Sequence, residues 1–420
     1  MNILLINALL YTFWFLISFK KDGKITVYSF LVLFYLCISL IGFYSVNNQI
    51  YYNTFGFYSL SKLSIEPYIY CFITYFILFL PFYKVKVNIK NVDFIFTRKT
   101  KKIVSCWIII YVFYTLLKLS EAIISLSLGL AATYEARHNE GITLFEYNLI
   151  LAKFNGYAYF FLQATLPFIM LYALFGVKKK YISSRMSMIL IVLCFLPSFL
   201  ESLGMGSRGG MFMTFFCFLF FFIMLYDQLS KKFIHTIYTF TILFISCILV
   251  YSWAITVDRV GHASGLDSII RYFGEAFPNL GWTVWDNAVY HPMGERFFPN
   301  FLDNSYVRKL SVSDAYLYWQ QVTGVPVLNF KTYFGDLYVE FGTIGAFIFL
   351  FLTSIPIWLY YKKKGITIFN IGYLYFYFQL CVFAFSGFTK TGWNSIFQLI
   401  IISLFVLYLK YIYKHNQKKI

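Results

Sequence analysis

The apolar stretch 2-NILLINALLYTFWFLISF-19 decides the class of protein. It contains no charged side chain, and a helix over it is long enough to cross the hydrocarbon core of a bilayer. No basic segment precedes it and no small-residue cleavage site follows it. We therefore expect a helix that stays in the membrane and not a cleaved signal peptide.

The composition of the whole chain agrees with this interpretation. Of the 420 residues, 60% are hydrophobic and 13% are charged, with a mean hydropathy of +0.68. A soluble protein of this length carries about a quarter charged residues. The composition predicts an all-α polytopic membrane protein. All seven cysteines fall inside apolar runs without paired spacing, so we expect neither a disulfide framework nor a metal site.

Further apolar runs of similar length follow along the chain, and each is a candidate transmembrane helix. We expect about 11 transmembrane helices, one for each apolar run. They lie near 2–19, 25–45, 67–84, 103–120, 149–176, 187–203, 209–226, 233–257, 334–360, 366–386 and 393–413.

The basic residues between these runs predict the topology. Most of the 35 Lys and Arg residues lie in one alternating set of loops: 20–24, 84–102, 178–185, 227–232, 361–364 and 414–420. The positive-inside rule places these loops in the cytoplasm, with the N-terminus outside and the C-terminus inside. The net charge of +17 then reflects topology. Short lysine clusters without aromatic platforms do not indicate a nucleic-acid partner.

The cytoplasmic loops contain no GxxxxGK[ST] phosphate-binding loop, which argues against an ATP-driven pump. Function is expected on the outer side, where one long loop covers 258–333. It is rich in Trp, Tyr and Phe, a composition that disfavours disorder, so we expect a folded cap with short helices. The expected parts are 1–257 with eight transmembrane helices, the large extracytoplasmic loop 258–333, and 334–420 with three helices and a cytoplasmic tail.

Arginine is concentrated on the expected outer side. Arginine suits planar, bidentate contact with phosphate or carboxylate, whereas lysine is sufficient for topology. This distribution indicates an anionic ligand reached from the membrane, such as a lipid-linked phosphate or pyrophosphate. The outer arginines are Arg137, Arg208, Arg259, Arg271, Arg296 and Arg308.

The short connection 204-GMGSRGG-210 joins two apolar runs and contains Arg208. Its glycines permit close backbone approach, and the helix that follows presents N–H groups at its start. Together these features form a candidate anion site. The alternative is that Arg208 reaches the lipid headgroups from a tight turn between helices.

Three features together resemble a known family: GSRGG between two spans, the large outer loop, and 334-FGDLYVEFGTIGAF-347 opening the next helix. The chain resembles the bacterial O-antigen and capsule repeat-unit polymerases (Wzy) and, more distantly, the O-antigen ligases (WaaL). The resemblance implies a GT-C-like glycosyltransferase of the bacterial plasma (inner) membrane that needs no cofactor and no metal. Its substrates would be undecaprenyl-pyrophosphate-linked oligosaccharides joined on the outer face. A chain-length regulator and a flippase of the same pathway are expected partners.

The resemblance also implies roles for particular residues. Arg208 and Arg259 would be catalytic and hold the pyrophosphate, together with Arg137 and the segment containing Gly206, Ser207 and Gly209. The residues themselves, apart from the resemblance, make Asp336 and Glu340, spaced i, i+4 on one helix face, candidates to hold sugar hydroxyls or accept the acceptor's proton. Alternatively, they complement the dipole at the start of their helix. The base stays unassigned among the outer acids and histidines, which are Asp258, His262, Glu275, His291, Asp336 and Glu340. Further substrate contacts are expected from Arg271, His291, Lys331, Tyr338 and Lys390.

Two other functions remain open at this stage. In the ligases a His lies about nine residues before the acidic residue of this motif, and here that position is Lys331. A ligase would transfer the glycan to a different acceptor by the same chemistry. A flippase would need polar residues along a pathway open to both faces of the membrane.

Overall fold

The structure is a computed structural model of the chain. It describes residues 2–51, 63–85, 87, 95–129, 132, 149–205, 209–260, 265–298, 310, 312–327, 330–387 and 392–417. These residues are predominantly helical, and they contain an isolated parallel β-bridge between Val87 and Ile366. The all-α class predicted from the composition is therefore confirmed for the described part of the chain.

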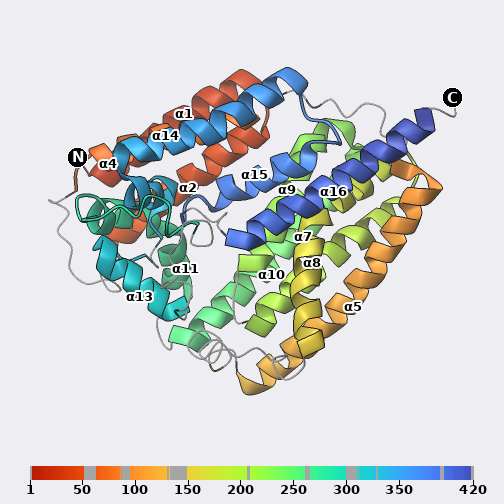
Figure 1. Cartoon of the computed structure of the whole chain (residues 1–420), viewed down its shortest axis with the longest axis horizontal. Helices are drawn as coiled ribbons and strands as arrows, with labels where there is room; N and C mark the ends of the chain where they lie inside the picture. Colours follow the sequence, from red (N-terminus) through yellow and green to blue (C-terminus); the bar gives the residue numbers. More distant parts are fainter. Residues whose placement is uncertain are drawn as a thin grey trace. The chain divides into compact units, whose positions relative to one another are not determined.

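The helices follow one another along the chain in the order shown in Figure 1. Most are long, and several short helical turns lie between them. Their bounds are α1 Ile3–Asp22, α2 Val27–Asn47, α4 Glu66–Phe79, η2 Leu80–Phe82, α5 Arg98–Leu128, α7 Leu149–Lys178, α8 Ser184–Met205, α9 Gly209–Leu225, η4 Tyr226–Gln228, α10 Lys231–Val260, α11 Gly265–Gly274, α12 Ala276–Asn279, η5 Leu280–Val284, α13 Val312–Thr323, α14 Thr332–Lys364, α15 Ile371–Phe383 and α16 Gly392–Gln417.

Eight helices of the described chain are long and apolar enough to cross a membrane: α1, α2, α5, α7, α8, α10, α14 and α16. Three shorter apolar helices, over Glu66–Phe82, Thr214–Gln228 and Ile371–Phe383, lie in the remaining expected spans. The chain thus has the helices of a multi-pass membrane protein. The expected number of about 11 spans stays a prediction, because eight of these helices are long enough to cross a membrane and three are shorter.

Local signals in the sequence set the helix ends. The Asn2 side chain accepts a hydrogen bond from the Leu4 N–H and caps the start of α1. Gly23 ends that helix in the left-handed conformation, with φ of 64°. Thr26 and Ser29 then form a reciprocal capping box at the start of α2. Such caps satisfy backbone groups that have no partner inside the helix.

The expected span 366–386 is shorter in the structure, and this is a correction. Helix α15 begins at Ile371, because Gly365 leaves α14 with φ of 68° and the backbone does not continue as a helix. The Asn370 side chain accepts a hydrogen bond from the Thr367 N–H at 2.7 Å, which stabilises a turn before the helix. Hydropathy alone does not detect such a turn.

The chain forms two compact units. Unit 1 consists of Met1–Lys86, Leu266–Gly365 and Leu380–Ser395; unit 2 consists of Val87–Gly265, Ile366–Gln379 and Ile396–Ile420. The short helices α11, α12, η5 and α13 all come from the long loop 258–333, and they belong to unit 1 except for the first residue of α11. The described part of this loop is therefore folded and partly helical, as its aromatic composition predicts.

Unit 1 packs α1 along α2 and α4 along α14. Its core contains the fully buried Tyr35 and Tyr75, whose hydroxyls donate to the carbonyls of Cys381 and Ala384 at 2.8 and 2.9 Å. These bonds satisfy two carbonyls at the end of α15, where the helix supplies no further donors. The same connection also meets α14, because the Thr332 N–H donates to the Phe385 carbonyl at 3.1 Å.

Unit 2 is built around α5 and α8, which pack along each other. The Tyr111 hydroxyl of α5 donates to the Cys194 carbonyl of α8 at 2.9 Å. The Trp107 indole donates to Thr165 of α7 at 2.9 Å. These buried polar contacts fix the registers of three long apolar helices, whose hydrophobic surfaces alone specify register weakly.

Candidate functional site

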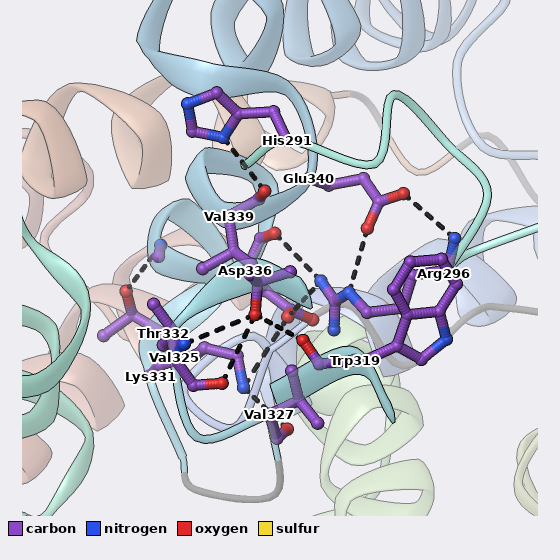
Figure 2. Close-up of polar contacts among 12 residues, drawn as sticks. His291, Arg296, Trp319, Val325, Val327, Lys331, Thr332, Asp336, Val339 and Glu340 are labelled. Atoms are coloured by element: carbon purple, nitrogen blue, oxygen red, sulfur yellow. Dashed lines mark hydrogen bonds and ion pairs between the residues drawn. The ribbon is translucent and has the colours of Figure 1, made fainter. Parts of the chain in front are cut away.

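A buried ionic cluster lies in unit 1 at the N-terminal part of α14 (Figure 2). We define it as Arg296, Lys331, Asp336 and Glu340. Arg296 comes from the long loop, and its guanidinium points between the two carboxylates. The cluster contains two basic and two acidic side chains, so its charges balance when all four are ionised.

Glu340 holds the loop segment that contains Arg296. One carboxylate oxygen, Oε1, accepts the N–H groups of Gly294 and Arg296 at 2.8 and 3.2 Å. The other, Oε2, accepts the Arg296 Nε–H at 2.9 Å. The residue is fully buried, so these donors replace water around the charge. This arrangement makes Glu340 an anchor for the loop.

Asp336 lies one turn earlier on the same helix face. Its Oδ1 accepts a hydrogen bond from Arg296 Nη2 at 2.7 Å and lies 3.8 Å from the Lys331 ammonium. The backbone of Gly387 lies against the other oxygen, since a Cβ there would come within 2.8 Å of Oδ2. Asp336 is thus enclosed by two cations and a close backbone segment.

Burial affects the two cations of the cluster differently. Burial lowers the pKa of Lys331 to about 8, although nearby Asp336 acts in the opposite direction. The Lys331 ammonium also donates to the Val327 carbonyl at 2.7 Å. For Arg296, burial again acts to lower the pKa, but the carboxylates of Asp336 and Glu340 outweigh it and raise the value. Arg296 therefore keeps its charge, whereas burial makes the Lys331 ammonium easier to deprotonate than that of an exposed lysine.

A kink in α14 explains why the loop docks at this point. Gly342 has φ of 68° and ψ of 179°, a conformation essentially restricted to glycine. The kink interrupts the helical hydrogen bonds, and the loop supplies replacement donors. His291 Nδ1 lies 3.0 Å from the Val339 carbonyl, and the Met293 N–H donates to the Glu340 carbonyl at 2.8 Å. A bond from Nδ1 to a carbonyl requires the tautomer protonated at Nδ1.

The predicted acid pair does not complement the dipole at the start of its helix. Helix α14 begins at Thr332, and no acidic residue lies in its first turn. Because the dipole effect fades beyond that turn, the partners of Asp336 and Glu340 are the cations of the cluster. The shared helix face predicted from their spacing is present, since both carboxylates bind one guanidinium.

Aromatic side chains lie beside the cluster. The rings of Tyr338 and Trp285 are 4.9 Å apart, and Tyr338 also meets His291 at 5.7 Å. Trp282 and Trp319 are buried, and the Trp282 ring lies 5.3 Å from the ring of Tyr51. Tyr338 and His291, both predicted substrate contacts, therefore contact each other, and His291 bonds the carbonyl of Val339, the residue before Glu340.

The other predicted site residues come from other helices or lie outside the described part of the chain. Arg271 is in the last turn of α11, with Nε 3.8 Å from Glu275 Oε2. Arg259 lies in the last turn of α10 and Gly209 begins α9, both in unit 2. Arg208, Gly206, Ser207, Arg137 and Lys390 lie outside the described residues, so their roles stay predictions.

Sequence reasoning did not single out Arg296 as a site residue. It was one of six outer arginines, and its partners Asp336 and Glu340 follow 40 and 44 residues later. No local spacing connects them. A signal did exist in the motif itself, because two carboxylates on one buried helix face require a cation nearby.

Comparison with known proteins finds no match. No protein-family model, no curated protein and no solved structure is significantly similar to this chain.

Proposed function

We propose that this chain is a polymerase of undecaprenyl-pyrophosphate-linked oligosaccharide repeat units for O-antigen or capsular polysaccharide. It acts as a GT-C-like glycosyltransferase on the outer face of the bacterial inner membrane. The proposal is supported by the multi-pass helical fold, the family resemblance of the GSRGG and FGDLYVEFG segments, and the charged cluster beside the folded loop.

The observation that carries the proposal is the position of the ionic cluster on α14. The cluster includes residues of the first turns of this helix, and Lys362, Lys363 and Lys364 lie in its last turn. By the positive-inside rule, the lysine end faces the cytoplasm. The cluster then belongs to the outer side, where polymerisation of lipid-linked units takes place.

The reaction breaks the bond between the donor sugar and its pyrophosphate and forms a glycosidic bond to the acceptor sugar. The acceptor hydroxyl oxygen attacks, its proton moves to a base, and undecaprenyl pyrophosphate leaves with the bonding electrons. We assign the base to Asp336, because its side chain is 9% exposed whereas that of Glu340 is completely buried. Pyrophosphate is a good leaving group, so a weak carboxylate base is sufficient.

Cations that meet the leaving pyrophosphate lower the barrier as its negative charge grows. The family resemblance gives this role to Arg208 and Arg259, with Arg137 and the N–H groups of 206–209 in support. No metal or organic cofactor takes part in the proposed reaction. A chain-length regulator and a flippase are the partners proposed for the pathway.

The function is tested by the glycan profile of host cells that lack the gene. Wild type and Asp314→Asn, a control at an exposed carboxylate of α13, should restore a ladder of polymer lengths. Asp336→Asn, present in the membrane at the same level, should leave a single repeat unit on its acceptor. Long polymer with Asp336→Asn would contradict the assigned base. Loss of every surface glycan in the deletion strain would instead indicate a flippase or a ligase.

A further inference from the structure

A second group of buried charges lies in unit 2, and its residues are distant in sequence from those of the ionic cluster. The Lys118 ammonium of α5 lies 3.0 Å from Glu121 Oε2 and 3.3 Å from Glu201 Oε1 of α8. The Lys118 side chain is completely buried and also lies 5.3 Å from the centre of the Tyr114 ring. We call Lys118, Glu121 and Glu201 the Lys118 triad.

Both helices of the triad are long and apolar enough to span the membrane. Ionisable groups inside such helices cost free energy to bury and mark functional positions. The bland explanation is that Lys118 only neutralises two carboxylates. The surroundings of the triad indicate that it also holds the end of α8 in place, because several independent contacts are made to the last turns of this helix.

Two of these contacts satisfy carbonyls that α8 itself leaves without donors. The helix ends at Met205, so the last four carbonyls have no intrahelical partner. The Ser125 hydroxyl of α5 donates to the Gly204 carbonyl at 3.2 Å, and the Tyr251 hydroxyl of α10 donates to the Ser202 carbonyl at 2.5 Å. Side chains of two neighbouring helices therefore hold this helix end.

Close packing supports the same conclusion. A Cβ at Gly204 would lie 3.2 Å from the Cβ of Glu121 and 3.5 Å from the Ala122 nitrogen. The missing side chain lets α8 approach α5 beside Glu121, a partner of Lys118. The end of α8 is thus fixed by charge, by hydrogen bonds and by backbone approach at once.

We propose that Lys118 is a positioning residue for the segment that follows α8. Lys118 holds Glu201 and the last turns of α8 against α5, and Gly206, Ser207 and Arg208 follow this helix end in the sequence. This inference rests on the proposed role of Arg208 in binding pyrophosphate. A small displacement of a binding group can slow a reaction about 100-fold, so the position of this helix end matters.

The first test asks whether Lys118 and Arg208 act through one another. Arg208→Lys should reduce polymer formation partially, because lysine does not replace bidentate contacts. Lys118→Met should reduce it by about 100-fold at equal membrane level. The double variant should be no worse than Lys118→Met alone. Losses that multiply in the double variant would overturn the proposal, since sites that act independently combine in this way.

The second test does not depend on glycan chemistry. Hydrogen exchange in the purified protein should become at least about tenfold faster in the peptide covering 199–205 in Lys118→Met, because local opening of this helix end is easier. Lys101→Met, which removes an exposed lysine from the same helix, should leave that peptide unchanged. Unchanged exchange in Lys118→Met would overturn the positioning role.

A third variant covers the case in which Lys118→Met does not accumulate. Lys118→Met/Glu121→Gln/Glu201→Gln removes every charge of the triad, and neutral replacements of buried ion pairs are usually tolerated. It should reach the membrane and still show faster exchange in 199–205. If this variant exchanges like wild type, the proposal is wrong. If exchange rises while Arg208→Lys polymerises normally, the proposed function of Arg208 fails and the anchoring of α8 stands.

Discussion

Replacing Arg296 with methionine should destabilise unit 1 strongly. The Arg296 guanidinium bonds Asp336 at 2.7 Å and Glu340 at 2.9 Å, and the side chains of these two residues are 9% and 0% exposed. Methionine fills much of the same volume but supplies neither the charge nor the donors. The variant therefore leaves buried carboxylates without their principal cation.

The size of the effect follows from this burial. Removing one partner of a buried ion pair destabilises a protein by about 3–5 kcal/mol. For a unit of about 200 residues, each kcal/mol lowers the melting temperature by about 2–4 °C. Lys331 remains 3.8 Å from Asp336 and compensates part of the loss. We expect a decrease of about 10 °C.

The assay is thermal unfolding of the detergent-solubilised protein, followed by tryptophan fluorescence. Arg185→Met is the matched control, since Arg185 is exposed on α8. Arg296→Met/Glu340→Gln removes one charge of each sign, leaves Lys331 with Asp336, and should recover much of the lost stability. A melting temperature for Arg296→Met within about 2 °C of wild type would refute the view of a tightly coupled buried cluster.

Two further predictions concern single positions in unit 1. Gly342→Ala should destabilise by about 1–3 kcal/mol, because its φ of 68° excludes ordinary side chains and a Cβ would meet His291 Nε2 at 3.3 Å; a melting temperature equal to wild type would contradict this. Burial raises the pKa of Glu275 to about 7 from 4.5, against the opposing effect of Arg271. Between these pH values the folded state binds more protons than the unfolded state, so stability decreases as pH rises. Glu275→Gln should remove about 3 kcal/mol of this loss of stability between pH 4 and pH 8. The measurement is the melting temperature of wild type and of Glu275→Gln as a function of pH. Parallel profiles would contradict the raised pKa of Glu275.

The fold could be predicted from the sequence to a large extent because a bilayer restricts the choices. An apolar run without charges must bury its backbone groups in a helix, so 2–19 and the runs after it predict helices directly. The kink at Gly342 was not predicted, because hydropathy does not register a single glycine at positive φ. The turn before α15 was missed for the same reason, since 366–370 is apolar enough to resemble the helix that follows.

The candidate site could be predicted only in its local part. The spacing of Asp336 and Glu340 placed both on one helix face, which the structure contains. Their partner Arg296 depends on how the long loop folds, and no periodicity in the sequence encodes that contact. The Lys118 triad shows the same division, because Glu121 is three residues from Lys118 on one helix, whereas Glu201 reaches it only through packing of α8 on α5.

The most direct test of the proposed function uses the purified protein in liposomes, supplied with lipid-linked repeat units extracted from its host. Mass spectrometry should detect lipid-linked products of two and more units, with one undecaprenyl pyrophosphate released for each bond formed. Asp336→Asn should form no such products, although it inserts into the liposomes as wild type does. Wild type that leaves every unit single, whether it moves them across the bilayer or transfers them to another acceptor, would contradict the assignment as a polymerase.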